Sequence, residues 1–200
     1  MIGKWARAAV SALAIGAVVL AAGVPVVGIA VAQGAAPPAS ASAAVKAAWA
    51  KAAVVQLVIA AGNDGNALKA SLAALLLANP GLAGDLTLAV VDVAENGAEG
   101  VVANASLAGV MAEGVAVAVA QWQSTSANSP AASVALAAVN AAFETAGVSR
   151  GSVFGASFAV ALNQEGGALL PPVLAEQSSP LAVVIPFLQQ DSNDEISRNT

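Results

Sequence analysis

Apolar residues fill most of the chain, and short polar stretches divide them into segments of helical length. Between residues 43 and 163 most segments begin after Ser, Asp or Asn and stop at Gly or Asn-Pro, the residues that start and end helices. This pattern predicts an all-α fold with six helices. They cover about residues 43–61, 67–78, 80–96, 107–123, 130–146 and 150–163.

Side-chain caps favour helices over strands in these segments. An N-cap oxygen accepts a hydrogen bond from a free backbone N–H of the first helical turn. Two Val-rich stretches, residues 86–93 and 115–119, keep a strand as the alternative, because Val alternating with Ala leaves both faces apolar. The predicted N-caps are Ser42, Asp64 or Asn66, Asn79 before Pro80, Ser129 before Pro130, and Ser149.

The N-terminal segment combines two positive charges with a long apolar run. Lys4 and Arg7 come first, and residues 8–45 carry no charged side chain. Within this stretch, residues 8–32 are apolar and long enough to cross a bilayer. A positive start followed by an apolar helix predicts an export signal or a membrane anchor over residues 1–32.

Cleavage and anchoring are both open for this segment. Cleavage is the favoured interpretation, because the small residues Ala30 and Ala32 precede Gln33, which would begin the mature chain. Pro25 supports it, since proline kinks a spanning helix. The alternative is an uncleaved anchor over residues 8–32, which is longer than the roughly 7–15 apolar residues of a usual signal.

Apolar runs after residue 45 are shorter. They extend for about a dozen residues before a Gly, Pro, Asn or charged residue interrupts them. A membrane-spanning helix needs about 20 apolar residues. The run lengths therefore predict that only residues 8–32 can cross a bilayer.

Composition divides the remaining chain into four parts. Residues 33–42 are rich in Ala, Pro and Ser, which predicts a linker, and residues 43–165 form the predicted helical domain. Residues 166–190 are broken by prolines and contain an apolar patch at 181–188, which we expect to dock on the core or on a partner. Residues 191–200 predict a disordered acidic tail.

A short motif recurs at the predicted helix starts. Residues 78–84 (ANPGLAG) resemble residues 103–109 (ANASLAG), and residues 127–133 (ANSPAAS) are a looser copy, at spacings of 25 and 24 residues. Stacked helical units have such spacings, and recurring caps are the alternative explanation. Behind a signal, in an Ala- and Val-rich body, these starts resemble alanine-rich exported bacterial proteins with short helical repeats. The resemblance covers about residues 66–146 and implies no activity and no site residues.

The overall composition limits how the helices can pack and which classes of partner the chain can bind. Apolar residues make up 58% of the chain but aromatic residues only 4%, so small side chains require close helix packing. Five of the seven basic residues and all twelve acidic residues follow residue 32, and this acidic balance argues against nucleic-acid binding. Apolar surface left over by small side chains favours a protein partner or self-association. A membrane is a further partner through residues 8–32.

Missing residue types exclude much catalytic and metal chemistry. The chain has no Cys, no His and no Tyr, so disulfides, Ser-His-Asp triads and His or Cys metal sites cannot form. We therefore predict no catalytic, cofactor-binding or metal-ligating residue.

Serine and lysine residues offer the weakest of the remaining catalytic patterns. Ser157 lies in the stretch GASFA, which approaches a nucleophile elbow, but without a histidine base it is predicted to be a small residue at a helix interface. A Ser-Lys pair would need a lysine with a lowered pKa beside a serine. Lys46, Lys51 and Lys69 lack the Ser-x-x-Lys spacing, so solvated surface positions are the favoured interpretation.

Carboxylates and aromatic residues complete the candidates. Asp85 and Asp92 are seven residues apart and share a helix face, where a solvated face is favoured over a paired-carboxylate site. Residues 63–66 (NDGN) resemble part of a calcium loop, and a helix cap is favoured. Trp49 and Trp122 are possible interface anchors, and packing in the core or half-buried against it is the favoured interpretation.

These patterns favour an exported, non-enzymatic envelope or secreted protein with an interaction or structural role. Its predicted fold is a small-residue-rich helical bundle or a short irregular helical array behind the N-terminal segment. A membrane-associated protein anchored by the uncleaved helix over residues 8–32 is the second interpretation. An enzyme using carboxylates or a Ser-Lys pair is the third, and an unselected reading frame without cooperative unfolding is the fourth.

Overall fold

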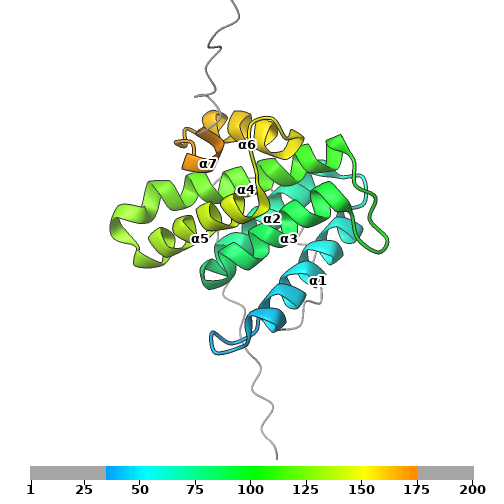
Figure 1. The fold of residues 1–200 in the computed structure, drawn as a ribbon, viewed down its shortest axis with the longest axis horizontal. Coiled ribbons are helices and arrows are strands. Elements are labelled where there is room, and N and C mark those ends of the chain that lie inside the picture. Colours follow the sequence, from blue (N-terminus) through cyan, green and yellow to red (C-terminus); the bar gives the residue numbers. More distant parts are fainter. Residues whose placement is uncertain (1–34, 175–200) are drawn as a thin grey trace, which may run out of the picture.

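The computed structural model describes residues 35–174, and in this range the fold is all-α, as predicted (Figure 1). All six predicted helices are present. Residues 86–93 and 115–119 lie inside helices, so the strand alternative is wrong. In chain order the helices are α1 (Ala43–Ala61), α2 (Gly65–Ala78), η1 (Pro80–Leu82), α3 (Ala83–Asn96), α4 (Ala105–Thr125), η2 (Ser126–Asn128), α5 (Pro130–Ala146), α6 (Val153–Gln164) and α7 (Pro171–Leu174).

Several predictions fall on residues that lie outside the described range. They concern export, docking of the C-terminal patch and the acidic tail. The residues are 1–32 with the cleavage position at Ala30, Ala32 and Gln33, the patch at 181–188, and the tail at 191–200.

The six long helices lie in two rows of three. In one row α4 packs between α6 and α2, and in the other α3 packs between α5 and α1. Contacts of α4 with α5, of α3 with α4 and of α1 with α2 join the two rows. Helix α1 ends its row and lies at an edge of the body (Figure 1). Helix α4 is therefore enclosed by neighbours, whereas α1 has neighbours on one side.

Side-chain caps fix where most helices begin. Ser42, Asp64 and Ser129 each accept a hydrogen bond from the backbone N–H three residues later, as predicted. Asn104 caps α4 in the same way, and its Oδ1 lies 2.9 Å from the N–H nitrogen of Leu107. Each cap satisfies one of the free N–H groups of a first turn.

The predicted N-cap Ser149 is wrong, and Asn79 precedes Pro80 at the start of η1 as predicted but makes no side-chain cap bond there. The Nδ2 of Asn79 donates to the carbonyl oxygen of Leu75 at 2.8 Å, which closes α2, and the chain enters α3 through the 3-10 turn η1. Ser152 replaces Ser149 as the cap of α6, because its Oγ accepts from the N–H of Gly155 at 3.0 Å. Asn and Ser bond to backbone groups on either side of a helix end, so the local sequence does not distinguish these roles.

Close approach of the helices compensates for the small side chains. In α4, a Cβ placed on Gly114 would lie 3.1 Å from the Cβ of Leu72 and 3.1 Å from the carbonyl oxygen of Lys69, both in α2. The backbone of α4 thus meets α2 without a side chain between them. This contact provides the packing density that large aliphatic residues provide elsewhere.

Aromatic packing joins α5 to α6. The ring of Phe143 meets the ring of Phe158 edge-on with centroids 4.8 Å apart, and it meets Phe154 edge-on at 6.1 Å. All three side chains are fully buried. Edge-to-face pairs contribute about 0.5–1.5 kcal/mol beyond their buried area. Three of the chain's few aromatic residues therefore hold the second row against the first.

The packed body continues past the predicted boundary at residue 165. The Nε2 of Gln123 donates to the carbonyl oxygen of Ala168 at 2.7 Å, and the N–H of Ala168 donates to its Oε1 at 2.8 Å. Beyond these two hydrogen bonds, Leu170 and Val173 are buried in the core. The first part of the proline-broken segment therefore docks on the helical domain.

Candidate functional site

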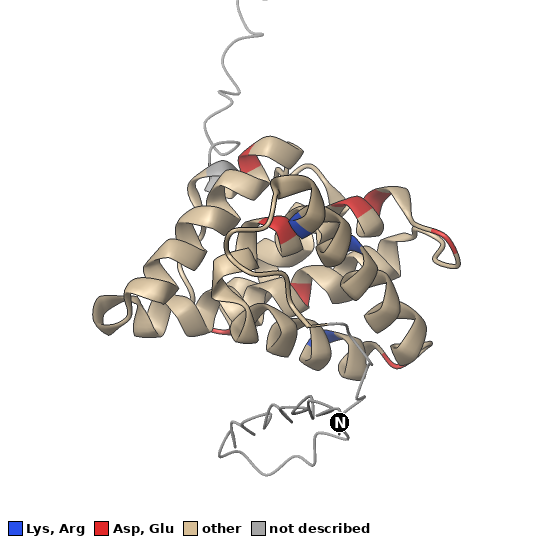
Figure 2. Ribbon diagram, turned by 90° about the horizontal axis from the view of Figure 1, so that it is seen from below, with Lys and Arg blue, Asp and Glu red and all other residues tan. Residues whose placement is uncertain are grey.

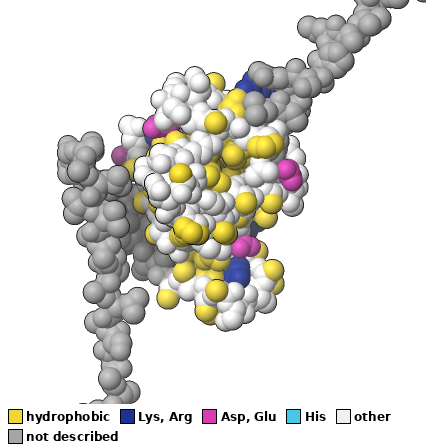
Figure 3. Space-filling model, turned by 90° about the vertical axis from the view of Figure 1, so that its left-hand side faces the viewer, with side chains coloured by type: hydrophobic (Ala, Val, Ile, Leu, Met, Phe, Trp, Pro, Cys, Tyr) yellow, Lys and Arg dark blue, Asp and Glu magenta, His cyan; other side chains and the backbone are white. Residues whose placement is uncertain are grey.

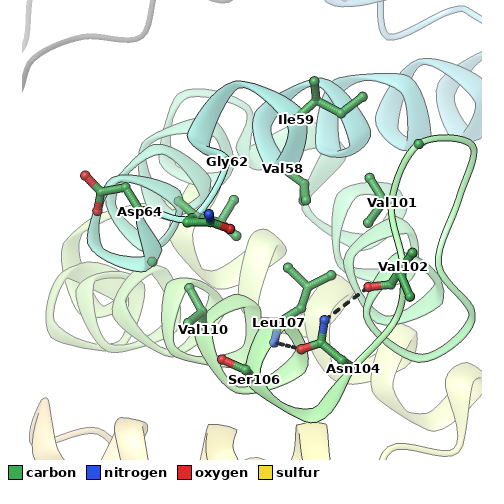
Figure 4. A pocket seen from close by; sticks show the side chains of 14 residues that line it. Val58, Ile59, Gly62, Asp64, Val101, Val102, Asn104, Ser106, Leu107 and Val110 are labelled. Carbon is green, nitrogen blue, oxygen red and sulfur yellow. Dashed lines mark hydrogen bonds between the residues drawn. The ribbon is translucent and has the colours of Figure 1, made fainter.

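A cleft of about 470 Å³ opens where four segments meet (Figure 4). These are the C-terminal end of α1, the N-terminal ends of α2 and α4, and the loop from α3 to α4. Its volume falls in the range of roughly 300–1,000 Å³ that is typical of ligand pockets.

Glycine at position 97 sets the path of the loop that forms one wall. Gly97 ends α3 with a φ of 74°, and a Cβ there would lie 2.7 Å from the carbonyl oxygen of Val101. Ala98 and Val101 then exchange two backbone hydrogen bonds of 3.0 and 2.9 Å. This turn buries Val101 and leaves the next residue, Val102, at the surface.

Large apolar side chains form an exposed lip on this cleft. Val102 is 81% exposed and Ile59 of α1 is 50% exposed, and both line the opening (Figure 4). The walls below them are apolar as well. They include Val58, Leu68, Leu107 and Val110.

Polar groups at the rim mostly serve the helix ends. Asp64 accepts from the N–H of Ala67 at 3.0 Å. Asn104 is used twice, because its Oδ1 caps α4 and its Nδ2 donates to the carbonyl oxygen of Val102 at 3.2 Å. Ser106 adds a hydroxyl at the same edge. The cleft therefore offers apolar contact area with hydrogen-bonding groups around it.

The outer side of α1 forms a second exposed surface, which continues to the lip of the cleft. We call it the α1 face. Its members lie three or four residues apart on the side turned away from α2 and α3, and Gln56 alone among them is polar. They are Val45, Ala48, Ala52, Gln56 and Ile59.

Exposed apolar side chains elsewhere are more scattered. Val134 lies on α5, and Val153 and Val160 lie on α6 among polar neighbours such as Ser157 and Gln164. Figure 3 shows apolar side chains dispersed over one face of the body between few charged ones. Single exposed apolar residues are normal for a soluble surface, whereas a continuous stripe indicates contact with something else.

Within residues 35–174, two helices are long and apolar enough to cross a membrane, so the prediction that only residues 8–32 qualify is wrong. They are α1, with 19 residues and a mean hydropathy of 1.5, and Ala105–Asn128, with 24 residues and 1.3. Gly65–Ala78 and Pro80–Asn96 form a third candidate if this pair, bent by 97°, is one span. The prediction failed because one or two charges interrupt an apolar run without making the whole helix polar.

The three lysines considered for catalysis are each engaged with an oxygen acceptor. Lys51 and Lys69 tie α1 to α3 and α2 to α4, respectively. The nitrogen–oxygen distances are 2.7 Å from Lys46 to the carbonyl of Ala39, 2.7 Å from Lys51 to Asp92, and 3.4 Å from Lys69 to Glu113.

Asp85 and Asp92 lie on the same side of α3, as their spacing predicts. Together with Lys51 they line a cleft of about 180 Å³ between α1 and α3. Asp92 accepts hydrogen bonds from Lys51 at 2.7 Å and from the Nδ2 of Asn96 at 3.0 Å. These two bonds, that of Lys51 first, lower the pKa of Asp92. The geometry makes Asp92 part of an ion pair that holds α1 on α3 (Figure 2 shows the charged positions).

The other polar candidates have structural positions. Residues 63–66 are occupied by the start of α2, where Asp64 is the cap. Within residues 35–174, no three acidic side chains gather where they could hold a metal ion. Ser157 is half-buried, and its Oγ lies 3.6 Å from a Cβ placed on Gly109 of α4. Its predicted role as a small interface residue is confirmed.

The two tryptophans occupy different environments. Trp122 is 4% exposed and belongs to the core, so it presents no side chain at the surface. Trp49 is half-buried on α1 and packs against the core. The large exposed apolar side chains at the lip of the cleft are instead Ile59 and Val102. Sequence reasoning missed both, because Val101 and Val102 are adjacent in the predicted loop and only the structure shows which of them is exposed.

Compared with known protein families, curated proteins and solved structures, the chain has no match in any of the three. The resemblance to alanine-rich exported repeat proteins therefore stays a prediction. In the structure the three motif copies all lie at helix starts, but their caps differ. Asn104 caps α4 and Ser129 caps α5, whereas Asn79 closes the preceding helix.

Proposed function

We propose that this chain is an exported, non-enzymatic interaction protein of the cell envelope or the secreted fraction. The observation that carries the proposal is the α1 face, an uncharged stripe that runs along an edge helix to the exposed lip of the cleft. Only 28% of the most apolar window of α1 is buried, against 50% for Ala105–Asn128. An edge helix that keeps its apolar side in water is best explained by a partner that covers it.

Export is the second part of the proposal, and it is supported by the sequence. Lys4 and Arg7, the uncharged apolar run and the small residues before Gln33 together have the order of an export signal. Because the chain has no cysteine, the exported domain would rely on its core or on association rather than on disulfides.

Intact mass in fractionated cells tests the export. We expect a soluble species outside the cytoplasm that begins near Gln33. A cytoplasmic species of full length, 19.2 kDa, would contradict export.

A membrane-associated protein is the second candidate. It is favoured by the two described helices that are apolar and long enough to span a bilayer, in addition to residues 8–32. For this candidate we expect the full-length species to stay in the membrane pellet after washes with high salt and with alkali. Release by either wash would contradict it.

A further inference from the structure

We propose that Asn96 is a site of spontaneous deamidation, and that its conversion to isoaspartate remodels the loop that forms one wall of the cleft. The residues that carry this inference are the last ones of α3 and the first ones of the loop from α3 to α4. It depends on the chemistry of this chain alone, so it holds whether or not the chain is exported or bound to a partner.

The sequence at the end of α3 combines the two residue types that deamidation favours. Asn96 is the only asparagine of the chain that is followed by glycine. Asparagine is thermolabile, because the backbone nitrogen of the next residue can attack its side-chain carbonyl carbon. Glycine makes this attack easiest, since it has no Cβ in the way and the widest choice of backbone conformations. Asn96 is exposed, so water reaches the reacting groups.

The reaction consumes water and releases ammonia. The nitrogen of Gly97 attacks Cγ of Asn96 and gives its proton to water, while Nδ2 takes a proton from water and leaves as ammonia. This step closes a succinimide ring. A water molecule then adds to one of the two ring carbonyls and breaks its bond to the Gly97 nitrogen. Opening at Cγ gives aspartate, whereas opening at the backbone carbonyl gives isoaspartate, in which the main chain continues through Cβ and Cγ.

Two hydrogen bonds at the end of α3 hold the reacting groups in the folded chain. The N–H of Gly97 donates to the carbonyl oxygen of Val93 at 3.0 Å, and the Nδ2 of Asn96 donates to Oδ1 of Asp92 at 3.0 Å. Helix ends fray, and the first of these bonds closes the last turn of α3. Opening of this turn frees the attacking nitrogen without unfolding of the body. The fold therefore slows the reaction but does not prevent it.

The loop after α3 has little room for a longer main chain. Gly97 is buried, and a Cβ there would lie 2.7 Å from the carbonyl oxygen of Val101 and 3.1 Å from the nitrogen of Ala103. Two backbone hydrogen bonds between Ala98 and Val101 close the turn. Isoaspartate adds one carbon to the main chain directly before this turn. It should therefore displace the residues that bury Val101 and present Val102 at the lip of the cleft.

The added negative charge is the weaker part of the change. The product carboxylate lies four residues from Asp92, which also loses the hydrogen bond from the Asn96 amide. Asp92 keeps its ion pair with Lys51 at 2.7 Å, and exposed charges contribute little to stability. We therefore expect the longer main chain, rather than the charge, to determine the effect of the modification.

Peptide mapping by mass spectrometry tests the reaction in the purified full chain, aged in its folded state at mildly alkaline pH. Conversion at Asn96 should exceed conversion at Asn163 at least tenfold. Asn163 is the internal control, because it is also exposed in the last turn of a helix but is followed by Gln164. Urea should accelerate the reaction at Asn96 roughly tenfold by opening the turn. Equal conversion at the two asparagines, or none at Asn96, would overturn the site.

Hydrogen exchange followed by nuclear magnetic resonance tests the effect on the loop. In the isoaspartate form, the N–H groups of Ala98 and Val101 should exchange roughly tenfold faster than in the unmodified chain. Asn96→Asp is the matched control, because it adds the same charge without lengthening the main chain, and its exchange should stay within about twofold. Unchanged exchange in the isoaspartate form, or equal acceleration in Asn96→Asp, would overturn the remodelling of the loop.

Discussion

Helices α1 and α4 have nearly the same sequence character and opposite positions in the fold. Both are long and apolar, with mean hydropathies of 1.5 and 1.3, and both are rich in Ala and Val. Yet α4 packs against α2, α3, α5 and α6, whereas α1 packs against α2 and α3 at the end of a row. Apolar length alone therefore does not say whether a helix builds the core or faces outward.

The residues that interrupt the apolar sequence differ between α1 and α4, and they account for the different positions of the two helices. Helix α4 has a glycine at position 114, where the neighbouring helix α2 approaches its backbone. Helix α1 has no glycine but carries Lys46 and Lys51, which keep its flanks in contact with polar groups. Helix α4 is therefore closely packed by its neighbours, whereas the outer side of α1 stays exposed.

The largest expected difference in stability is between a lysine placed in α4 and the same substitution in α1. Ala116 of α4 is fully buried, and Ala116→Lys would desolvate an ammonium group at a cost of at least several kcal/mol. Because domains are stable by only about 5–15 kcal/mol, we expect loss of the folded state. The matched Ala52→Lys lies on the exposed α1 face and should cost less than about 0.5 kcal/mol. Thermal unfolding followed by circular dichroism measures both. Similar losses in the two variants would mean that the α1 face is not exposed.

Two glycines of α4 should respond in opposite directions. A side chain at Gly114 meets Leu72 at 3.1 Å, so Gly114→Val should overpack the contact with α2 and destabilise the fold by about 2–3 kcal/mol. At Gly109 the nearest atom is the Oγ of Ser157 at 3.6 Å, which is ordinary contact. Gly109→Ala should therefore stabilise the helix by about 0.5–1 kcal/mol. The urea denaturation midpoints show whether each variant is more or less stable than the natural chain. Destabilisation by Gly109→Ala as well as by Gly114→Val would contradict the assigned packing.

The C-terminal end of α4 holds the segment that leads to α7. Gln123→Ala removes both hydrogen bonds to Ala168 and should cost about 1–2 kcal/mol, mostly in local opening. The backbone N–H of Ala168 should then exchange hydrogen roughly 5- to 30-fold faster, as measured by nuclear magnetic resonance or mass spectrometry. Gln121→Ala, at an exposed position of the same helix, is the control. Unchanged exchange at Ala168 would show that the burial of Leu170 and Val173 holds the segment without the two hydrogen bonds from Gln123.

Local signals in the sequence were sufficient to predict the helices. Ser42, Asp64 and Ser129 cap the helices that they were predicted to cap, because an N-cap is a contact within one turn. The side chain of Asn79 bonds backwards to Leu75, and Ser152 rather than Ser149 caps α6, because Asn and Ser side chains can bond to backbone groups on either side of a helix end. The choice depends on which turn the core favours, and that is a tertiary property.

The candidate surface was much less predictable than the helices. Nothing local distinguishes the exposed Val102 from the buried Val101, since the outcome depends on the turn that follows Gly97. Likewise, Trp122 and Trp49 have similar polar neighbours in the sequence, but only Trp122 is fully inside the body. Burial depends on which helix occupies the middle of a row, and Ala-Val patterns that are apolar on every side do not encode this order.

The smallest expected effect concerns the ion pair that joins the edge helix to its neighbour. The folded state lowers the pKa of Asp92, chiefly through Lys51, so the pair stabilises the fold above the unfolded pKa of about 3.9. That contribution disappears as the pH falls through the lower, folded pKa. The side chains of Lys51 and Asp92 are 50% and 42% exposed, so Asp92→Asn should cost only about 0.5 kcal/mol at neutral pH. The deficit relative to the natural chain should vanish in strong acid.

Urea denaturation at neutral and at acidic pH checks this dependence. Asp85→Asn is the matched control, because it removes one negative charge from the same cleft and leaves the bond between Lys51 and Asp92 intact. An equal deficit at both pH values would show that Asp92 contributes through packing or helix propensity rather than through its charge. If the Asp92→Asn deficit is absent at neutral pH too, apolar contacts with α2 and α3 hold α1 without help from the ion pair. The attachment of α1 to the body would then depend on its buried side, which includes Val54, Leu57 and Val58.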